Sequence, residues 1–386
     1  MIYLDNAATT KIDPAVLDAM MPYLTEMYGN AGSLYSLGRD ARHAVDRARE
    51  QVAEFINADP DHVIFTSGGT ESNNMVFAGL GDFLQDHGKT HVISAKNEHD
   101  SVRRSAAKMC VKRGFDLTTL YTNESGVIDF GCLRDAIRPT TGLVSIMFMN
   151  NETGAINPVE EIGHACGEHG LWFHTDCVQA AGCIELDVQR IMCDFLSLSS
   201  HKIHGPKGTG ALFVRDAREL RPLIIGGHNQ ENGLRGGTEN VAGIVGFGAA
   251  CEIAKRDLEE NQSHALRLKD GFYSTLCSEL ERYNLAHKLH LNADTLRLHG
   301  KTINLRLDDV DAETLLLMLD ARGVCVSAGS ACRSHESEPS QVLMAMGLSP
   351  EDARNSIRVS FSRMNTLNEC EEAARIIAAC ARCLTQ

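Results

Sequence analysis

The sequence predicts an α/β protein, in which a mostly parallel sheet covered by helices is followed by a smaller α+β domain. Short apolar segments alternate with helical ones between residues 90 and 215, a rhythm typical of parallel sheets. A long helical stretch from Thr238 to about Arg282 then leads to four further apolar segments that alternate with helices. With 386 residues, 43% of them hydrophobic, the chain can bury cores of this size.

The elements before residue 90 follow from local signals. Residues 1–10 are expected to be extended, and Asp13 followed by Pro14 has the cap and first-turn residue that begin a helix. Residues 36–57 have the pattern of an amphipathic helix. Residues 63–66 form an apolar strand that runs into a glycine-rich loop at 67–72, which opens the next helix.

The remaining strands are predicted from apolar runs. In the large sheet they are expected at 91–94, 117–121, 143–149, 171–173, 195–198 and 211–214, and in the second unit at 287–291, 301–307, 324–326 and 357–361. Four polar residues follow the carboxyl ends of strands in the first set: His99, Asn151, Asp176 and Lys202. An open α/β sheet binds its ligand at that edge, so we expect the functional site there.

Charge and composition exclude several classes of partner. The formal net charge of −14 argues against nucleic acid or an anionic membrane surface, because both require a basic footprint. A small-molecule substrate fits better. The sequence contains no 18-residue apolar run and no signal peptide at Met1, so we expect a cytoplasmic location.

The thirteen cysteines are scattered rather than spaced as a disulfide framework or zinc site. Most are therefore expected to be reduced core residues. Cys380 and Cys383 have CxxC spacing, but within a C-terminal helical pattern they are expected to belong to its apolar face. No resident metal is expected.

Lys202 lies in the polar, glycine-rich loop 199–210, directly after an apolar strand. A lysine held where its amine can lose a proton is the usual covalent anchor for a carbonyl compound such as pyridoxal phosphate (PLP). Asp176 follows the preceding predicted strand at 171–173, and adjacent parallel strands would bring it to the same sheet edge. A carboxylate there could keep a pyridine nitrogen protonated. A lone loop lysine would normally be solvated, but the two segments in this order favour a cofactor site.

The loop at 67–72 places two glycines and hydroxyl side chains at a helix N-terminus. Free backbone amides and the positive end of the helix dipole suit a phosphate group. Most such turns only cap a helix. The loop is interpreted as a phosphate site because the chain also contains Lys202.

Two further residues suggest substrate chemistry. Cys332 lies in a tract at 327–340 that is too polar and small-sided for a core element and is expected to be an exposed loop. Arg333 and His335 beside it would favour a thiolate, which is an effective nucleophile. Arg358 lies in a strand-like run, where it is either an ordinary strand-end arginine or the anchor of a carboxylate through two parallel hydrogen bonds.

Nine motifs together carry a resemblance over nearly the whole chain. They are YLDNAATT at 3–10, FTSGGTESN at 65–73, EH at 98–99, NNE at 150–152, HTDCVQ at 174–179, SHK at 200–202, RGGTEN at 235–240, SAGSAC at 327–332 and IRVS at 357–360. In content and order the sequence resembles the NifS/IscS-type cysteine desulfurases. These are PLP enzymes of fold type I, the aspartate-aminotransferase-like fold.

The resemblance implies a large PLP-binding domain with a mostly parallel seven-stranded sheet at 16–259. A small α+β domain would be formed by 1–15 and 260–386 and would carry the cysteine loop. Lys202 would hold PLP, Asp176 would face its pyridine nitrogen, Gln179 its phenolic oxygen, and His99 would stack on the ring and move protons. The phosphate would be held by Gly69, Thr70, Ser199 and His201, with Thr238 supplied by the other subunit of a homodimer. The substrate-binding residues would be Arg358, Asn151, Asn6 and Ala7.

The activity implied is conversion of L-cysteine to L-alanine, with the sulfur transferred to Cys332 as a persulfide. The polar insertion between Cys332 and Pro339 resembles that of the group with a long mobile cysteine loop. From this loop the sulfur would pass to an acceptor protein, for iron–sulfur cluster assembly, tRNA thiolation or DNA sulfur modification. The sequence does not distinguish among these acceptors.

Three departures from the family pattern stand out. Residues 30–35 read NAGSLY where the family usually has Asn-Pro-Ser-Ser-x-His, and residues 230–233 read QENG where Gln-Glu-Arg-Gly is usual. Both bear on contacts between subunits or at the entrance. Cys177 replaces the common alanine beside Asp176 and is expected to be a buried small thiol.

Other functions remain open at this stage. A selenocysteine lyase or an aminotransferase of the same fold is the main alternative, although the cysteine loop disfavours the aminotransferase. A sulfur-carrying or scaffold protein with a decayed active site would not retain the PLP set. A metalloprotein could use His174, Asp176, His201 and His204, but this leaves Lys202 and Cys332 unexplained.

Overall fold

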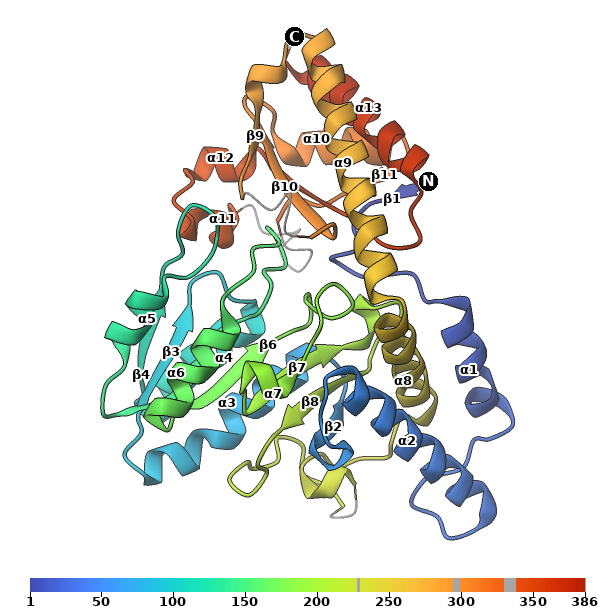
Figure 1. Ribbon diagram of the computed structural model, residues 1–386, viewed down its shortest axis with the longest axis vertical. Helices are drawn as coiled ribbons and strands as arrows, with labels where there is room; N and C mark the ends of the chain where they lie inside the picture. Colours follow the sequence, from blue (N-terminus) through green and yellow to red (C-terminus); the bar gives the residue numbers. More distant parts are fainter. Residues whose placement is uncertain (228–229, 294–298, 330–337, 386) are drawn as a thin grey trace.

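The computed structural model describes residues 1–227, 230–293, 299–329 and 338–385 (Figure 1). A seven-stranded sheet forms the centre of the larger region, and its strands lie in the order β2-β8-β7-β6-β5-β3-β4. The pairs β4–β3, β3–β5, β5–β6 and β6–β7 are parallel, whereas β7–β8 and β8–β2 are antiparallel. The mostly parallel, helix-covered sheet predicted from the sequence is therefore confirmed.

The strands of this sheet agree closely with the apolar runs that predicted them. They are β2 Val63–Thr66, β3 His91–Ala95, β4 Asp116–Leu120, β5 Thr141–Ser145, β6 Trp172–Asp176, β7 Phe195–Ser199 and β8 Gly210–Val214. The largest difference is in β5, which was expected to reach residue 149. The chain beyond it stays buried but forms a turn at 150–154, closed by a bridge between Met149 and Ile156, and this turn carries Asn151 to the sheet edge.

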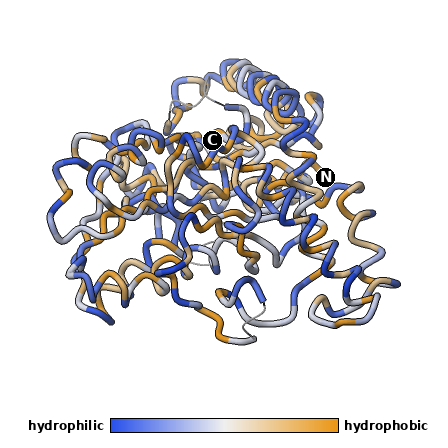
Figure 2. Tube along the Cα trace, turned by 60° about the horizontal axis from the view of Figure 1, so that its bottom comes forward, coloured by the Kyte–Doolittle hydropathy of each residue, from blue (hydrophilic) through white to orange (hydrophobic). Residues whose placement is uncertain are grey.

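The helices cover both faces of the sheet and form the outer shell of the molecule. They are α1 Pro14–Thr25, α2 Ser36–Phe55, α3 Gly69–Asp86, α4 Asp100–Arg113, α5 Phe130–Ala136, α6 Val159–His169, α7 Val188–Ile191, α8 Val241–Arg256, α9 Leu258–Arg282, α10 Ala312–Asp320, α11 Gln341–Ala345, α12 Pro350–Arg354 and α13 Leu367–Leu384. Asp13 caps α1 as expected, since its carboxylate accepts from the backbone N–H of Ala15 at 2.8 Å. In Figure 2 the peripheral helices alternate between hydrophilic and hydrophobic residues, which is the pattern of helices with one packed face.

The long helical stretch expected from Thr238 to Arg282 is two helices rather than one. Asp257, with φ −100° and ψ 15°, separates α8 from α9 because this conformation does not continue a helix. Thr238 itself precedes α8 in irregular chain, and Asn240 caps that helix by accepting from the backbone N–H of Gly243 at 3.2 Å. Figure 1 shows α9 running from the sheet region to the far end of the molecule.

The second region contains a three-stranded antiparallel sheet in the order β12-β10-β9, together with a parallel pair, β1–β11. These strands are β9 Leu289–Leu291, β10 Thr302–Leu307, β11 Val324–Cys325, β12 Ser356–Ser360 and β1 Ile2–Tyr3. The first residues of the chain thus lie beside α13 and β11, far from α2 (Figure 1). One buried apolar cluster includes Leu4 and otherwise only residues from 268 to 381. The domain boundaries at 15/16 and 259/260 stay a prediction that this cluster supports.

The described cysteines form no disulfide, and seven of these twelve are buried. Cys380 is fully buried whereas Cys383 is exposed, so the CxxC pair does not share one face. Cys177 is buried beneath the sheet edge, and burial raises the pKa of its thiol well above the usual range. Within the described part of the chain, no helix is long and apolar enough to span a membrane.

Candidate active site

An open cavity of about 780 Å³ lies at the carboxyl ends of the parallel strands, between the two regions of the molecule. Loops that follow β2, β3, β5, β6 and β7 contribute to it, joined by the N-terminal segment and by β12. It brings together eleven residues that the sequence analysis singled out: Ala7, Gly69, Thr70, His99, Asn151, Asp176, Gln179, Ser199, His201, Lys202 and Arg358. These residues come from positions 7 to 358, so only the fold assembles them.

Lys202 enters the cavity from a short 3-10 turn, Ser200–Lys202, directly after β7. Its Nζ donates to the backbone carbonyl of Ala7 at 2.5 Å and to that of Ala8 at 2.8 Å. The strand before it is buried along its whole length, which fixes the position from which the side chain projects. The N-terminal segment therefore holds the amine of Lys202 at the cavity wall.

Asp176 is the last residue of β6, which pairs in parallel with β7 as expected. Its Oδ2 accepts from Asn73 Nδ2 at 2.7 Å and its Oδ1 from the backbone N–H of Val178 at 3.0 Å. The carboxylate is 7% exposed. Two donors thus stabilise a buried negative charge that faces the same cavity as the lysine.

Gln179 and Asn151 line the cavity, and each has an amide oxygen that lacks a partner within the described residues. Gln179 donates from Nε2 to the carbonyl of Ala7 at 2.9 Å, but its Oε1 is buried without a hydrogen bond. The Oδ1 of Asn151 is in the same condition. Buried polar atoms are normally satisfied, so these two indicate that the cavity binds a polar group.

The loop after β2 has the backbone geometry of an anion cradle. Gly68 has φ +147°, a conformation that side chains rarely adopt, and it precedes Gly69 at the start of α3. A Cβ at Gly69 would lie 2.7 Å from Cγ2 of Val178, so this turn and the loop after β6 approach too closely for a side chain. The amides of Gly69 and Thr70 at the helix N-terminus, with Ser199 nearby, suit a phosphate.

His201 lies at the same end of the cavity. Burial, together with the nearby lysines 202, 207 and 301, lowers the pKa of its imidazole to about 4. Its Nδ1 is 3.1 Å from the hydroxyl of Thr9. A neutral ring there can contribute a hydrogen bond but no charge.

His99 follows β3 and caps α4. Its Nδ1 lies 2.7 Å from Ser101 Oγ and 3.2 Å from the backbone nitrogen of Ser101. Ser101 in turn accepts from Asn73 Nδ2 at 2.8 Å, so His99 and Asp176 are linked through two further side chains. The sequence analysis did not single out Asn73 or Ser101; Asn73 ends one quoted motif, but no signal pointed to Ser101.

Arg358 projects from β12 and is 1% exposed. Its Nη2 lies 2.7 Å from Asp5 Oδ1 and its Nη1 donates to the carbonyl of Asn151 at 2.9 Å, whereas its Nε has no partner within the described residues. The pairing with Asp5 was not anticipated. A substrate carboxylate would meet a guanidinium that is already held on two of its nitrogens.

The geometry matches that of known proteins. The family described as aminotransferase class-V matches residues 2–372. The chain belongs to this family. The cysteine desulfurase IscS of Methanosarcina thermophila is 40% identical over 376 residues, which cover 97% of this chain and 91% of that protein. A solved NifS-like protein has a TM-score of 0.89 at 33% identity, with 98% of each chain covered. A structure of SspA in complex with cysteine has a TM-score of 0.78 at 34% identity, covering 95% of this chain and 100% of the other.

These comparisons confirm the resemblance read from the motifs, and with it the fold class. Two predicted site residues nevertheless lie apart from the main cavity. Asn6 is buried and donates from Nδ2 to the carbonyl of Ser360 at 2.9 Å, so its amide braces β12. Thr238 is exposed on the surface before α8. Cys332 falls outside the described residues.

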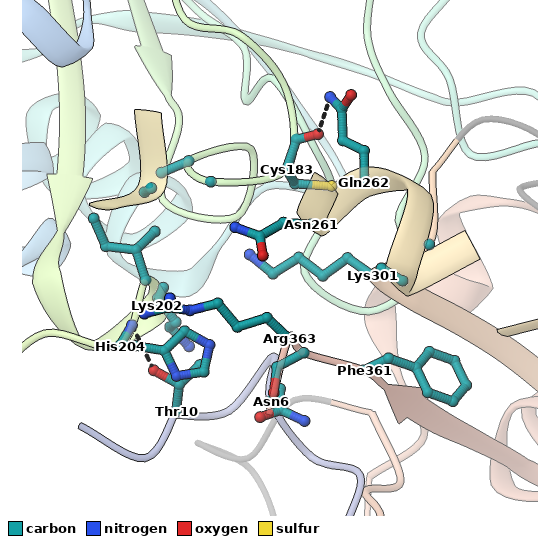
Figure 3. Close-up of a pocket in the computed structure, with 17 residues that line it drawn as sticks. Asn6, Thr10, Cys183, Lys202, His204, Asn261, Gln262, Lys301, Phe361 and Arg363 are labelled. Carbon is teal, nitrogen blue, oxygen red and sulfur yellow. Dashed lines mark hydrogen bonds between the residues drawn. The ribbon is translucent and has the colours of Figure 1, made fainter. Parts of the chain in front are cut away.

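A second cavity lies on the other side of Lys202 (Figure 3). Lys301 and Arg363 reach across it from the second region toward Lys202 and His204. Lys301 Nζ donates to the carbonyl of Gln179 at 2.7 Å, and burial lowers the pKa of this amine to about 8. In this member of the class-V aminotransferase family, the buried Lys301 thus holds the backbone at Gln179, three residues after Asp176.

The histidines that a metalloprotein would have used have other partners. His174 is buried within the sheet between Ser145 and Ser197, at 2.8 and 3.1 Å, and His204 contacts the carbonyl of Lys11 at 2.8 Å. Among the described residues, no three potential metal ligands cluster. The geometry accounts for these side chains as structural supports.

Proposed function

We propose that this protein is a PLP-dependent cysteine desulfurase. It converts L-cysteine to L-alanine and transfers the sulfur to Cys332. The carbon–sulfur bond of the substrate breaks, a sulfur–sulfur bond forms on the Cys332 thiolate, and a proton takes the place of the sulfur on carbon. One thiol and one cysteine thus yield alanine and a persulfide, with no external oxidant or reductant. The observation that carries the proposal is the meeting of Lys202 and Asp176 in one cavity of a class-V aminotransferase-family fold.

The residues of the cavity fit PLP. Lys202 supplies the amine that binds its aldehyde, Asp176 the carboxylate for its pyridine nitrogen, and the start of α3 the amides for its phosphate. The unpartnered oxygens of Gln179 and Asn151 provide polar atoms that the ring substituents and substrate can satisfy. When bound, PLP supplies an electron sink for the carbon atoms of the substrate.

The protein side chains perform the remaining tasks. Arg358, held by Asp5 and by the carbonyl of Asn151, orients the substrate carboxylate through its remaining N–H groups. Lys202, once released from the carbonyls of Ala7 and Ala8, moves the proton at the α-carbon. His99, which lines the same cavity, exchanges a proton at the substrate.

The residues that flank the Cys332 segment support its role. Ser327 exchanges two backbone hydrogen bonds with Arg358, at 3.1 and 2.6 Å, on one side of the segment. Ser340, on the other side, donates to Oε2 of Glu152 at 2.5 Å. Arg358 and Asn151, which precedes Glu152, are the residues proposed to hold the substrate carboxylate. Ser327 and Ser340, on either side of the Cys332 segment, are therefore both held at the substrate side of the cavity.

We also propose that the active protein is a homodimer. Several large apolar side chains are exposed on the described surface: Tyr28 at 75%, Leu34 at 90%, Tyr35 at 61% and Ile225 at 87%. Thr238, expected to serve the phosphate site of a second subunit, is exposed on the same chain. A partner copy would cover this apolar surface and complete the phosphate site. The sulfur then passes from Cys332 to an acceptor protein.

The central experiment is to mix the purified, PLP-loaded protein with L-cysteine and measure alanine and sulfide together. Lys202→Ala should abolish turnover because no other described side chain supplies an amine at this position. Equal amounts of alanine and transferred sulfur support the proposal. Sulfide release by the Lys202→Ala protein at the wild-type rate would contradict it.

A second variant tests the nucleophile. Cys332→Ser should keep the PLP absorbance and its change on adding cysteine, yet lose at least 100-fold in desulfuration, because a hydroxyl cannot accept the sulfur at neutral pH. Cys132→Ser and Cys383→Ser are matched controls at two exposed cysteines and should be as active as the wild type. The assignment fails if mass spectrometry finds the persulfide on another cysteine while Cys332→Ser remains active.

A further inference from the structure

A chain of three short hydrogen bonds joins Asp176 to His99, two residues proposed to contact the cofactor. Asp176 Oδ2 and Asn73 Nδ2 are 2.7 Å apart, Asn73 Nδ2 and Ser101 Oγ 2.8 Å, and Ser101 Oγ and His99 Nδ1 2.7 Å. All four residues line the main cavity. Asn73 lies on α3 and Ser101 on α4, so the packing of these two helices closes the chain.

The direction of each hydrogen bond follows from what each atom can donate. The Asp176 carboxylate can only accept, so the atom of Asn73 that faces it is the amide nitrogen. That nitrogen has two hydrogens, and the second points to Ser101 Oγ. The hydroxyl of Ser101 therefore accepts from Asn73 and keeps its own hydrogen for His99.

Two donors consequently converge on one nitrogen of His99. The hydroxyl of Ser101 is one, and its backbone N–H, at 3.2 Å from Nδ1, is the other. A hydroxyl can rotate, but a backbone N–H in the first turn of a helix cannot turn away. Nδ1 must therefore present a lone pair, and the proton of the neutral ring resides on Nε2.

The residues that link Asp176 to His99 are buried, and their hydrogen bonds leave one polar atom unsatisfied. Asn73 is 1% exposed and Ser101 8%. Within the described residues the Oδ1 of Asn73 is buried without a partner, so the amide is oriented for its two donors rather than for its acceptor. An arrangement that leaves one acceptor unsatisfied in order to place two donors indicates that the donors are the important groups.

We propose that Asn73 and Ser101 are positioning residues that fix His99 as its Nε2–H tautomer and couple it to Asp176. The chain of hydrogen bonds makes His99 a donor at Nε2. The consequence for catalysis rests on the proposed function. His99 delivers a proton from Nε2, whereas the base that removes a proton must be another group, such as the amine of Lys202. The same amide that sets the tautomer also stabilises the Asp176 carboxylate.

The tautomer can be read directly by two-bond ¹H–¹⁵N correlation spectra of protein labelled with ¹⁵N-histidine, with and without PLP. Loss of one set of signals in His99→Gln identifies His99 among the sixteen histidines. We expect Nδ1 of the wild type to resonate as the unprotonated nitrogen. In Ser101→Ala the proportion of the Nδ1–H tautomer should rise several-fold, and Ser101→Thr, which keeps a hydroxyl, should restore the wild-type pattern.

Kinetics provide a second readout. Ser101→Ala should lower kcat about tenfold and leave KM within about twofold, because misoriented acid–base catalysis affects the chemical step and not substrate capture. Ser105→Ala removes a buried serine one turn further along α4 that has no hydrogen bond to His99, Asn73 or Asp176. It should match the wild type in both measurements.

A wild-type spectrum with Nδ1 protonated would overturn the inference, as would a Ser101→Ala spectrum identical to that of Ser105→Ala. These outcomes are separate from those of the proposed function. A protein that released neither alanine nor sulfide would disprove desulfuration, while the nitrogen spectra would still decide which tautomer the chain of hydrogen bonds selects.

Discussion

At the scale of single residues, chemistry-bearing side chains could be predicted when they follow a recognisable strand. Lys202 and Asp176 follow neighbouring apolar runs, and parallel strands bring such residues to one sheet edge. The pair Asp5–Arg358 could not be predicted, because it joins opposite ends of the chain through the register of β12 beside the N-terminal segment. The same holds for Asn73 and Ser101, which meet only because α3 and α4 pack together.

Arg358 allows a test of substrate binding at this scale. Arg358→Lys keeps a positive charge for Asp5 but loses the planar donor set that reaches both the carbonyl of Asn151 and a substrate carboxylate. Loss of one charge-assisted hydrogen bond costs about 1.5–3 kcal/mol, so KM for L-cysteine should rise about 10- to 150-fold. Steady-state kinetics and a cysteine titration of the PLP absorbance measure the effect.

Asp5→Asn provides the comparison for this variant. It keeps the shape of the partner and removes its competing charge, so cysteine should bind at least as tightly as to the wild type. Unchanged KM in Arg358→Lys would show that the carboxylate is bound elsewhere.

At the scale of elements, the apolar runs located the strands of the seven-stranded and three-stranded sheets, but Ile2–Tyr3 was expected only to be extended and the strand ends were less well defined. Asp13 and Pro14 gave the start of α1 because a cap is a local signal. The break at Asp257 between α8 and α9 and the early end of β5 were missed, because each depends on packing against distant chain rather than on local composition. The turn after β5 is also where Asn151 and Glu152 contact the second region, which sequence period alone does not report.

The glycine turn before α3 yields the next prediction. Gly69→Ala would place a Cβ 2.7 Å from Val178 Cγ2, so either α3 or the loop that carries Asp176 and Gln179 must shift. Such overpacking costs about 1–3 kcal/mol, and the PLP dissociation constant should rise about tenfold as the phosphate amides move. Equilibrium binding of PLP to the apoprotein measures this change.

Two controls separate crowding from the loss of a glycine. Gly167→Ala, on α6, meets only Met192 Cε at 3.6 Å, an ordinary contact, and should leave PLP affinity unchanged. Combining Gly69→Ala with Val178→Ala removes the clash and should restore most of the affinity. If the double variant bound PLP as weakly as Gly69→Ala, close approach to Val178 would not be the reason for this glycine.

At the scale of the whole molecule, burial of neutral histidines sets a dependence on pH. Burial lowers the pKa to about 4 for five histidines: His91, His174, His201, His204 and His299. Nearby lysines add to the shift at His201 and His299. An unfolded chain binds these protons near pH 6.5, so between pH 6.5 and 4 it holds more of them than the folded protein. Their contribution to stability is complete above pH 6.5 and is lost as the pH falls toward 4.

Two carboxyl groups act in the opposite direction. Burial raises the pKa of Asp194 to about 6 and that of Glu98 well above its usual range, so both favour the folded state on acidification. Five groups outweigh two. We therefore expect the urea midpoint of the PLP-loaded protein, followed by far-ultraviolet circular dichroism, to fall steadily from pH 7 to pH 5.

His174 isolates one of these contributions. It is fully buried between Ser145 and Ser197, which are bound to opposite nitrogens of its ring, and an amide can keep one of the two contacts. His174→Gln should be less stable at pH 7, yet its free energy of unfolding should fall less steeply below pH 6.5, by about 1.4 kcal/mol per pH unit. His43→Gln, at an exposed histidine, is the matched control variant. Parallel slopes for His174→Gln and the wild type would mean that this imidazole titrates alike in the folded and unfolded chains, which its burial in the sheet argues against.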